Sequence, residues 1–461
     1  MNTDINPVTG KIFPVFFFYT VPSVIGLLAM SCAVVVDGFF LGNYAGMTSL
    51  TSVNLTIPAS GLLFGLALMF SVGGAIRCGK FIGSGNLKAA NSSFSQSIVF
   101  ISLLSLVLTI LGKVFMDQLV FLLTTDSALA PVVAEYLEIL LCFTVFQLGA
   151  LCLSYFLRVA GQPLWASATM IIGCFINVFL DWLFIAQFHM GHQGAALGTG
   201  LSAAVTFFLL CAPFFTNRTR LKFCWRTKDI SEVIKGAMAG LPEFVDEFSF
   251  GIFVFVFNWI IMRKLGASGV AAFSIINYMV ITVLVISYGI SDSMHPIISQ
   301  NRGALKHKRI KSFIIISMLS VFALGVAISS LLVTSPQAVS GLFIPSGERE
   351  TVQLTNHFIS KIWPVFIVNG INIVLAAYLT AMNRCVDSTL IILSRNIFLP
   401  VFFLFIIHIL IGGDGILIVL PLSELCTFFL SIFLLYKNRP EKLISNALMP
   451  IVAPARMYSV K

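Results

Sequence analysis

Charged side chains are scarce in this chain: Asp, Glu, Lys and Arg together make up 10% of its 461 residues. Hydrophobic residues make up 58%, and the mean hydropathy is +0.98. Because soluble domains carry about 25% charged residues, this composition excludes a soluble globular protein. The chain is predicted to be an all-α polytopic membrane protein.

Motifs that would indicate an enzyme or a metal protein are also missing. The nine cysteines are scattered without a C-x-x-C pair, and no D-D-x-x-D motif or His/Arg cluster of a membrane-embedded prenyltransferase or phosphatase is present. No G-x-x-x-x-G-K phosphate loop occurs, so ATP is not expected to be the direct energy source. His189 and His192 lie beside glycines in a short turn, which does not favour a metal site. We expect no enzyme activity and no cofactor.

Apolar segments of about 20 residues predict twelve transmembrane helices. With the N-terminus inside, 23 of the 28 Lys and Arg residues fall on inner loops and tails. This positive-inside distribution predicts an inner (plasma) membrane protein with both termini in the cytoplasm, and it accounts for the net charge of +9 without nucleic-acid binding. The predicted helices are 12–36, 48–72, 91–112, 132–156, 165–188, 194–215, 236–261, 270–292, 311–333, 357–381, 388–411 and 415–436.

The two halves of the sequence repeat each other. At an offset of 221, "LSAAVTFFL" (201–209) matches "LSELCTFFL" (422–430) at six of nine positions. The repeat predicts two pseudo-symmetric six-helix lobes related by an axis along the membrane normal. The N-lobe is 1–215, the basic linker 216–235, the C-lobe 236–436 and the basic tail 437–461. At an offset of 220, the aligned pairs are Pro22 with Pro242, Gly46 with Gly266, Ser71 with Ser291, Gly83 with Gly303, Lys88 with Lys308 and Ser97 with Ser317.

Four phrases together resemble the multidrug and toxic compound extrusion (MATE) family, most closely its DinF-type branch. They are "VDGFFLGNYAG" (36–46), "NLTIPASGLLFGLALMFSVGGA" (54–75), "GSGNLKAAN" (83–91) and "NVFLDWLFIAQFHMGHQGAALGTG" (177–200). The resemblance implies a secondary antiporter that exports drugs or toxic organic compounds by alternating access of its two lobes. It also implies a coupling site for H⁺ or Na⁺ in the N-lobe, where helix 1 bends at its proline. The matching positions are Pro22, Asp37, Asn177, Asp181 and Thr199.

The depth of these residues independently supports a shared site. Counted at 1.5 Å per residue, Asp181 and Thr199 lie about 10–12 Å below the outer surface, and Asp37 ends an outward-running helix. Asn177 projects on the same helix face as Asp181, because i and i+4 side chains point together. The structural alternatives are a buried Asp181 bonded to another helix, an Asp37 that caps helix 1, and a Thr199 bonded to its own backbone.

Further acids indicate a second cation site or a substrate cavity. Glu243, Asp246 and Glu247 share one face of helix 7, where they either gather or bind cations, or line a water-filled vestibule. Glu424 lies near the membrane midplane, whereas its repeat partner Ala203 is uncharged. Because acids outnumber bases inside the membrane, the expected substrates are cationic, amphipathic small molecules.

The alternative function is a lipid-linked oligosaccharide flippase of the same superfamily. Such a protein handles anionic lipids and would place Arg or Lys in its cavity, whereas Arg158 and Arg395 fall near the inner ends of predicted helices. Membrane lipid surrounds the protein in either case. The family resemblance implies a monomer.

Overall fold

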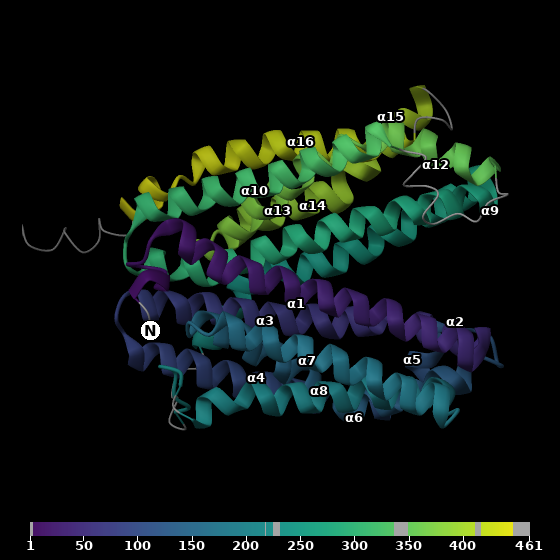
Figure 1. Cartoon of the computed structure of the whole chain (residues 1–461), viewed down its shortest axis with the longest axis horizontal. Coiled ribbons are helices and arrows are strands. Elements are labelled where there is room, and N and C mark those ends of the chain that lie inside the picture. The colour runs from purple at the N-terminus through teal and green to yellow at the C-terminus, as the bar shows by residue number, and fades with distance from the viewer. Residues whose placement is uncertain (1–2, 217, 225–230, 336–348, 411–415, 446–461) are drawn as a thin grey trace, which may run out of the picture. The chain divides into compact units, whose positions relative to one another are not determined.

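The computed structural model describes residues 3–216, 218–224, 231–335, 349–410 and 416–445, and these residues form helices without a strand (Figure 1). A short 3-10 turn, η1 (Thr3–Ile5), comes first. The first half then contains α1 (Ile12–Phe40), the π-helical turn η2 (Leu41–Ala45), α2 (Gly46–Leu55), α3 (Ile57–Gly83), α4 (Leu87–Val114), α5 (Met116–Leu123), α6 (Ala130–Val159), α7 (Pro163–Asp181), the π-helical turn η3 (Trp182–Gln187) and α8 (Gly191–Phe215). The second half contains α9 (Ser231–Gly303), α10 (His307–Thr334), α12 (Arg349–Ile362), α13 (Val365–Ala381), α14 (Cys385–Leu393), the π-helical turn η4 (Ser394–Phe398), α15 (Leu399–Leu410) and α16 (Ile416–Lys437).

The prediction of an all-α polytopic membrane protein is confirmed. Within the described residues, ten helical segments are long and apolar enough to cross a membrane, and a bent pair makes an eleventh. The remaining predicted helix, 236–261, lies within α9, which also contains the predicted helix 270–292. Large apolar side chains are exposed along the helices, among them Phe121, Phe175 and Phe405, as expected where the surroundings are hydrocarbon rather than water.

The start of the second transmembrane helix differs from the prediction. The apolar run from residue 48 suggested one helix over 48–72, but 46–55 form the separate helix α2 and α3 begins at Ile57. The Thr56 hydroxyl donates to the Val53 carbonyl at 2.7 Å, closing α2. Pro58 then occupies the first turn of α3, where its missing N–H costs no hydrogen bond. Hydropathy alone does not register this break.

Prolines act differently in two other helices. Gln353–Ile362 and Val365–Ala381 meet at a bend of 51° beside Pro364, where a continuous helix would lack a hydrogen bond. Pro22, in contrast, is buried inside the continuous helix α1. The bending of helix 1 at Pro22 stays a prediction.

The chain divides into two compact units, and the borders predicted for the lobes stay predictions. Unit 2 comprises Phe17–Cys78 and Leu87–Gly251. In it α6 packs against α4 and α8, and α8 also packs against α7, so these helices run side by side (Figure 1). Unit 1 comprises Met1–Phe16, Gly79–Asn86 and Ile252–Lys461, and in it α13 packs against α10, α14 and α16.

Glycines allow very close helix contacts within each unit. In unit 2, a Cβ at Gly73 of α3 would overlap the Gly236 carbonyl of α9, and one at Gly240 would overlap the Met69 carbonyl. The backbones of α3 and α9 therefore touch, as in G-x-x-x-G crossings between membrane helices.

The contact in unit 1 is reciprocal. A Cβ at Gly83 would overlap the Gln300 carbonyl, and a Cβ at Gly303 would overlap the Lys80 carbonyl. Gly83 and Gly303 are repeat partners at an offset of 220, and so are Lys80 and Gln300.

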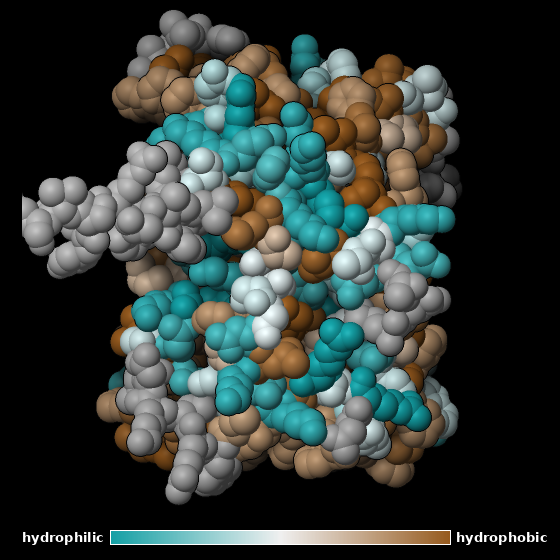
Figure 2. Space-filling view, turned by 90° about the vertical axis from the view of Figure 1, so that its left-hand side faces the viewer, coloured by the Kyte–Doolittle hydropathy of each residue, from teal (hydrophilic) through white to brown (hydrophobic). Residues whose placement is uncertain are grey.

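Hydrophilic residues gather at one end of the helices. Figure 2 faces the end that carries the N-terminal segment and shows teal, hydrophilic residues spread over much of it, with brown, hydrophobic residues between them. Lys88 and Lys308 lie in the first turns of α4 and α10, and Lys222 lies in the segment after α8. The pattern fits a protein whose helix ends face water and whose helix flanks face lipid.

Candidate functional site

Two carboxyl groups meet in unit 2. Asp37 lies near the end of α1, and Asp181 is the last residue of α7, directly before the π-helical turn η3. The side chains of Asp181 and Asn177 both lie close enough to the Asp37 carboxyl group to interact with it. Asp181 is 0% exposed, Asn177 is 6% exposed and Asp37 is half-buried. Three of the four predicted coupling residues are therefore in direct contact.

The protonation state decides whether this contact is stable. With both carboxyl groups ionised, Oδ1 of Asp37 and both carboxylate oxygens of Asp181 lack a hydrogen-bond donor. Two carboxylates repel each other, and a hydrogen bond between them requires one shared proton. A bound cation would satisfy the same oxygens. The arrangement has the chemistry of a site that takes up H⁺ or a hard cation.

The neighbourhood of Asp181 is closely packed. A Cβ at Gly198 of α8 would lie 2.5 Å from Oδ1 of Asp181, so α8 approaches the carboxyl group directly. Apolar side chains that include Leu41, Ile185 and Ala196 form a buried cluster beside the pair. Apolar packing excludes water and raises the energetic cost of two charges in one place.

Thr199 follows Gly198 in α8 and is half-buried. Its carbonyl accepts a hydrogen bond from the Ser202 hydroxyl at 2.9 Å. Among the described contacts, its own hydroxyl does not reach either carboxyl group. Thr199 is thus the chain neighbour of Gly198, whose backbone lies against Asp181. The role of Thr199 as a cation ligand stays a prediction.

Two features of the site were not predicted from the sequence. Tyr136 of α6 is buried and interacts electrostatically with both Asp37 and Asp181. The π-helical turns η2 and η3 follow the two aspartates and pack against each other. Wide turns of this kind frequently mark functional sites. The signal for Tyr136 is a tyrosine at the same depth as the aspartates, but a lone tyrosine in an apolar helix is not specific.

The predicted acids of helix 7 lie on a different pair of helices. Glu243, Asp246 and Glu247 are half-buried in the first part of α9. Asp246 acts electrostatically on Glu247, whose Cβ would lie 3.4 Å from a Cβ at Gly65 of α3. The structure places Glu247 at the interface of α9 and α3, where Asp246 acts on it, whereas Asp37 and Asp181 belong to α1 and α7.

Glu424 lies in a buried polar cluster of unit 1. Asn369 Nδ2 donates to its Oε1, and Asn372 Nδ2 donates to its Oε2 at 2.7 Å and to its backbone carbonyl at 3.0 Å. The guanidinium Nε of Arg395 lies 3.7 Å from Oε1. Arg395 is in the middle of the membrane-spanning segment Cys385–Ile407.

The expectation that Arg395 lies near an inner helix end is therefore wrong. The span begins at Cys385 rather than at 388, and the side chain points to the acid of a neighbouring helix. Arg158, by comparison, does lie in the last turn of α6, with its guanidinium 5.4 Å from the ring centre of Tyr155.

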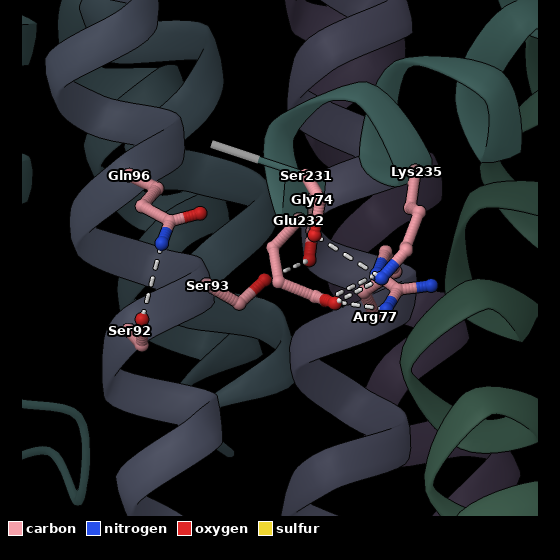
Figure 3. Close-up of polar contacts among 8 residues, drawn as sticks. All are labelled: Gly74, Arg77, Ser92, Ser93, Gln96, Ser231, Glu232 and Lys235. Carbon is pink, nitrogen blue, oxygen red and sulfur yellow. Dashed lines mark hydrogen bonds and ion pairs between the residues drawn. The ribbon is translucent and has the colours of Figure 1, made fainter. Parts of the chain in front are cut away.

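A second ion pair, also absent from the sequence predictions, joins α3 to the start of α9 (Figure 3). Arg77 donates from Nε to Oε2 of Glu232 at 2.8 Å and also donates from Nη2, and Lys235 Nζ lies 3.1 Å from Oε1. Burial raises the pKa of Glu232, but the hydrogen bonds and charges of Arg77 and Lys235 outweigh burial and leave this pKa below its ordinary value. The pair lies close to the glycine crossing at Gly73 and Gly236.

Fold and sequence together define the class of protein. The MatE family model matches residues 22–183 and again residues 242–406, and the two matches begin 220 positions apart, at Pro22 and Pro242. The chain is thus a duplicated, polytopic membrane transporter. It belongs to the MATE family.

The curated relatives are of matching length. The multidrug export protein MepA of Staphylococcus haemolyticus (strain JCSC1435) is 24% identical over 447 residues, which cover 95% of this chain and 96% of that protein. MepA of Staphylococcus aureus (strain NCTC 8325 / PS 47) is 24% identical over 446 residues, with the same coverage of 95% and 96%.

Solved structures share the fold. A crystal structure of MATE in complex with MaL6 superimposes with a TM-score of 0.90 at 20% identity and covers 96% of this chain and 100% of that one. A MOP superfamily transporter from Pyrococcus furiosus, described with a reversed polarity of its binding pocket, gives a TM-score of 0.88 at 20% identity and covers 96% and 99%.

Proposed function

We propose that this chain is a secondary active antiporter that exports cationic, amphipathic small molecules in exchange for H⁺ or Na⁺. The observation that carries the proposal is the contact between the carboxyl groups of Asp37 and Asp181 inside membrane-spanning helices. No basic residue of the described chain forms an ion pair with either group. Such a pair is stable only when it binds a proton or a cation from outside, and binding of this kind is what a coupling site does.

The coupling mechanism follows from the charge of the site. With one ion bound, the pair carries one negative charge or less, and α1, α7 and α8 can pack closely around it. Without the ion, repulsion between Asp37 and Asp181 favours a different packing of these helices. Loaded and empty sites therefore stabilise different states, which is the requirement for alternating access of two lobes.

The substrate class follows from the acids and from the named relatives. Glu243, Asp246 and Glu247 give the first part of α9 a negative field, which attracts cations and repels anions. Proteins of the same length and family are named multidrug export proteins. The proposal includes a monomer in the plasma membrane with both termini in the cytoplasm. Glu424 stays a candidate for the cavity wall.

Uptake of a fluorescent cationic dye into everted membrane vesicles tests the proposal. Export in the cell corresponds to uptake in these vesicles, driven by an imposed pH gradient or, separately, by a sodium gradient. Wild type should accumulate dye under one gradient, and Asp37→Asn and Asp181→Asn should abolish gradient-driven uptake. Asp117→Asn, which removes the same charge from an exposed position of α5, is the matched control. Wild type that moves no dye under either gradient refutes the proposal and favours the lipid-linked oligosaccharide flippase.

Thr199→Val separates the two candidate ions. Na⁺ binding would use carboxylate, amide and hydroxyl oxygens together, so loss of the hydroxyl should raise the sodium concentration needed for half-maximal uptake. Proton coupling through the carboxyl pair alone should not change with this substitution. Thr199→Ser, which keeps the hydroxyl, should behave like wild type under both gradients.

A further inference from the structure

Three helical elements of unit 1 place polar side chains around Glu424 of α16. Asn369 and Asn372 come from α13, Arg395 from the turn η4, and Tyr288 from α9. The carboxylate accepts hydrogen bonds from both asparagines. These partners hold the Glu424 carboxylate in one place, and more than 90% of the surface of this residue is buried.

The guanidinium of Arg395 is fixed as well. Its Nη2 donates to the Tyr288 hydroxyl at 3.0 Å and its Nε donates to Oδ1 of Asn396 at 3.1 Å. The side chains of Arg395 and Glu424 are 5% and 10% exposed. Arg395 Nε lies 3.7 Å from Glu424 Oε1, which is too long for a hydrogen bond. At this distance two opposite charges still attract each other strongly where little water is present.

The two buried acid sites are chemically related but differ in one component. Each combines carboxylate with asparagine amides: Asp37 and Asp181 with Asn177, and Glu424 with Asn369 and Asn372. The first has two acids and no described basic partner, so its neutraliser must come from outside. At Glu424 the guanidinium of Arg395 lies 3.7 Å from the carboxylate, so the chain itself supplies a positive charge.

The repeat shows that the acid and the base occur together. At an offset of 221, Glu424 aligns with Ala203 and Arg395 with Cys174. The other repeat therefore has neither member of the pair. A lone buried acid or a lone buried base would each be costly, whereas the pair is neutral as a whole.

We infer that the Glu424 cluster is a second cation site whose cation is the guanidinium of Arg395. Arg395 is a positioning residue that keeps Glu424 ionised and prevents it from taking up a proton or a free cation during transport. The inference rests on the proposed antiport, because it sets the number of coupling ions: the carboxyl pair of Asp37 and Asp181 carries the exchange, and Glu424 adds none. Removal of the Arg395 charge should turn Glu424 into an additional coupling site.

The transport test compares the dye gradient reached at equilibrium with the imposed ion gradient, which gives the number of ions exchanged per dye molecule. Arg395→Gln should exchange one more ion than wild type, and Glu424→Gln should exchange the same number as wild type. The double variant Arg395→Gln/Glu424→Gln should return to the wild-type number. A wild-type number in Arg395→Gln, or one ion fewer in Glu424→Gln, overturns the inference.

A spectroscopic test does not depend on transport. Infrared difference spectra of purified protein between alkaline and acidic buffer report carboxyl groups that gain a proton. Among the contacts given above, the ionisable groups are Arg395, which faces Glu424, and Tyr288, which accepts a hydrogen bond from Arg395, whereas the contacts from α13 are amides. Arg395→Gln should show a protonated-carboxyl band that Arg395→Gln/Glu424→Gln lacks, and wild type should match Glu424→Gln. A Glu424 band in wild type overturns the inference. Wild type that shows no gradient-driven uptake refutes the proposed function instead.

Discussion

The backbone of Gly198 lies against the carboxyl group of Asp181, so that a methyl group at position 198 would be 2.5 Å from Oδ1. Gly198→Ala should therefore displace Asp181 from Asp37. Crowding of this kind costs about 1–3 kcal/mol, and here the displaced group is the coupling carboxyl. We expect strongly reduced gradient-driven dye uptake and a lower unfolding midpoint in detergent.

Gly61→Ala is the control for this substitution. Gly61 is also helical, but a Cβ there meets no atom within 4 Å. Alanine at this position should leave uptake unchanged and stabilise the helix slightly. Equal loss of uptake in both variants would mean that helix glycines matter generally and that the contact with Asp181 does not.

The glycine crossing of α3 and α9 gives a second prediction. In Gly73→Ala the new methyl group would meet the Gly236 carbonyl, which is backbone and cannot rotate away. The two helices must separate, with a loss of about 1–3 kcal/mol or more in the free energy of unfolding. Thermal unfolding in detergent measures this loss, and an unchanged midpoint would contradict the close contact.

The ion pair of Arg77 and Glu232 gives a pH-dependent prediction. The pKa of Glu232 is lower in the folded chain than its ordinary value, so its carboxylate stabilises the fold above the ordinary pKa of glutamate. This contribution is lost as the pH falls through the lowered, folded-state pKa. Glu232→Gln should lower stability by up to about 1 kcal/mol at neutral pH, because the pair is partly exposed.

The unfolding midpoints of wild type and Glu232→Gln should converge in acid, once the pH is below the lowered folded-state pKa of Glu232. Glu441→Gln is the matched control, since Glu441 lies 3.9 Å from Lys311 in an exposed pair. It should have almost no effect at any pH. A difference between wild type and Glu232→Gln that persists in acid would show that the charge of Glu232 is not the cause.

Asn372 gives a prediction for the Glu424 cluster. Asn372→Ala removes a buried amide that donates twice to Glu424, at 2.7 and 3.0 Å. The loss should be about 1–3 kcal/mol in the free energy of unfolding, because the acceptor is charged and buried. In a double-mutant cycle the loss should be smaller when Glu424 is already Gln. Additive losses would indicate that the two residues do not interact.

The sequence predicted the main site better than the rest of the protein. Asp37, Asn177 and Asp181 could be brought together because helix depth and the i to i+4 spacing are regular properties of α-helices. Tyr136 was missed because its relevance depends on how α6 is rotated, which a single sequence does not specify.

Arg395 was misplaced because a shift of a few residues in a helix start changes the apparent depth of a side chain. Its partner, Glu424, lies on another helix, and contacts between helices are set by packing rather than by spacing along the chain. The break before α3 and the bend at Pro364 carry a proline signal in the sequence. Hydropathy windows average over both signals.

The reciprocal contact at Gly83 and Gly303 links the architecture to its origin by duplication. Position 83 meets position 300, and position 303 meets position 80, so each half offers to the other the same surface that it receives. This is the contact rule of an isologous interface between two identical subunits, here fulfilled inside one polypeptide. Neither glycine can be replaced by a larger residue without a shift of the helices, because the added side chain would overlap the backbone of the other half.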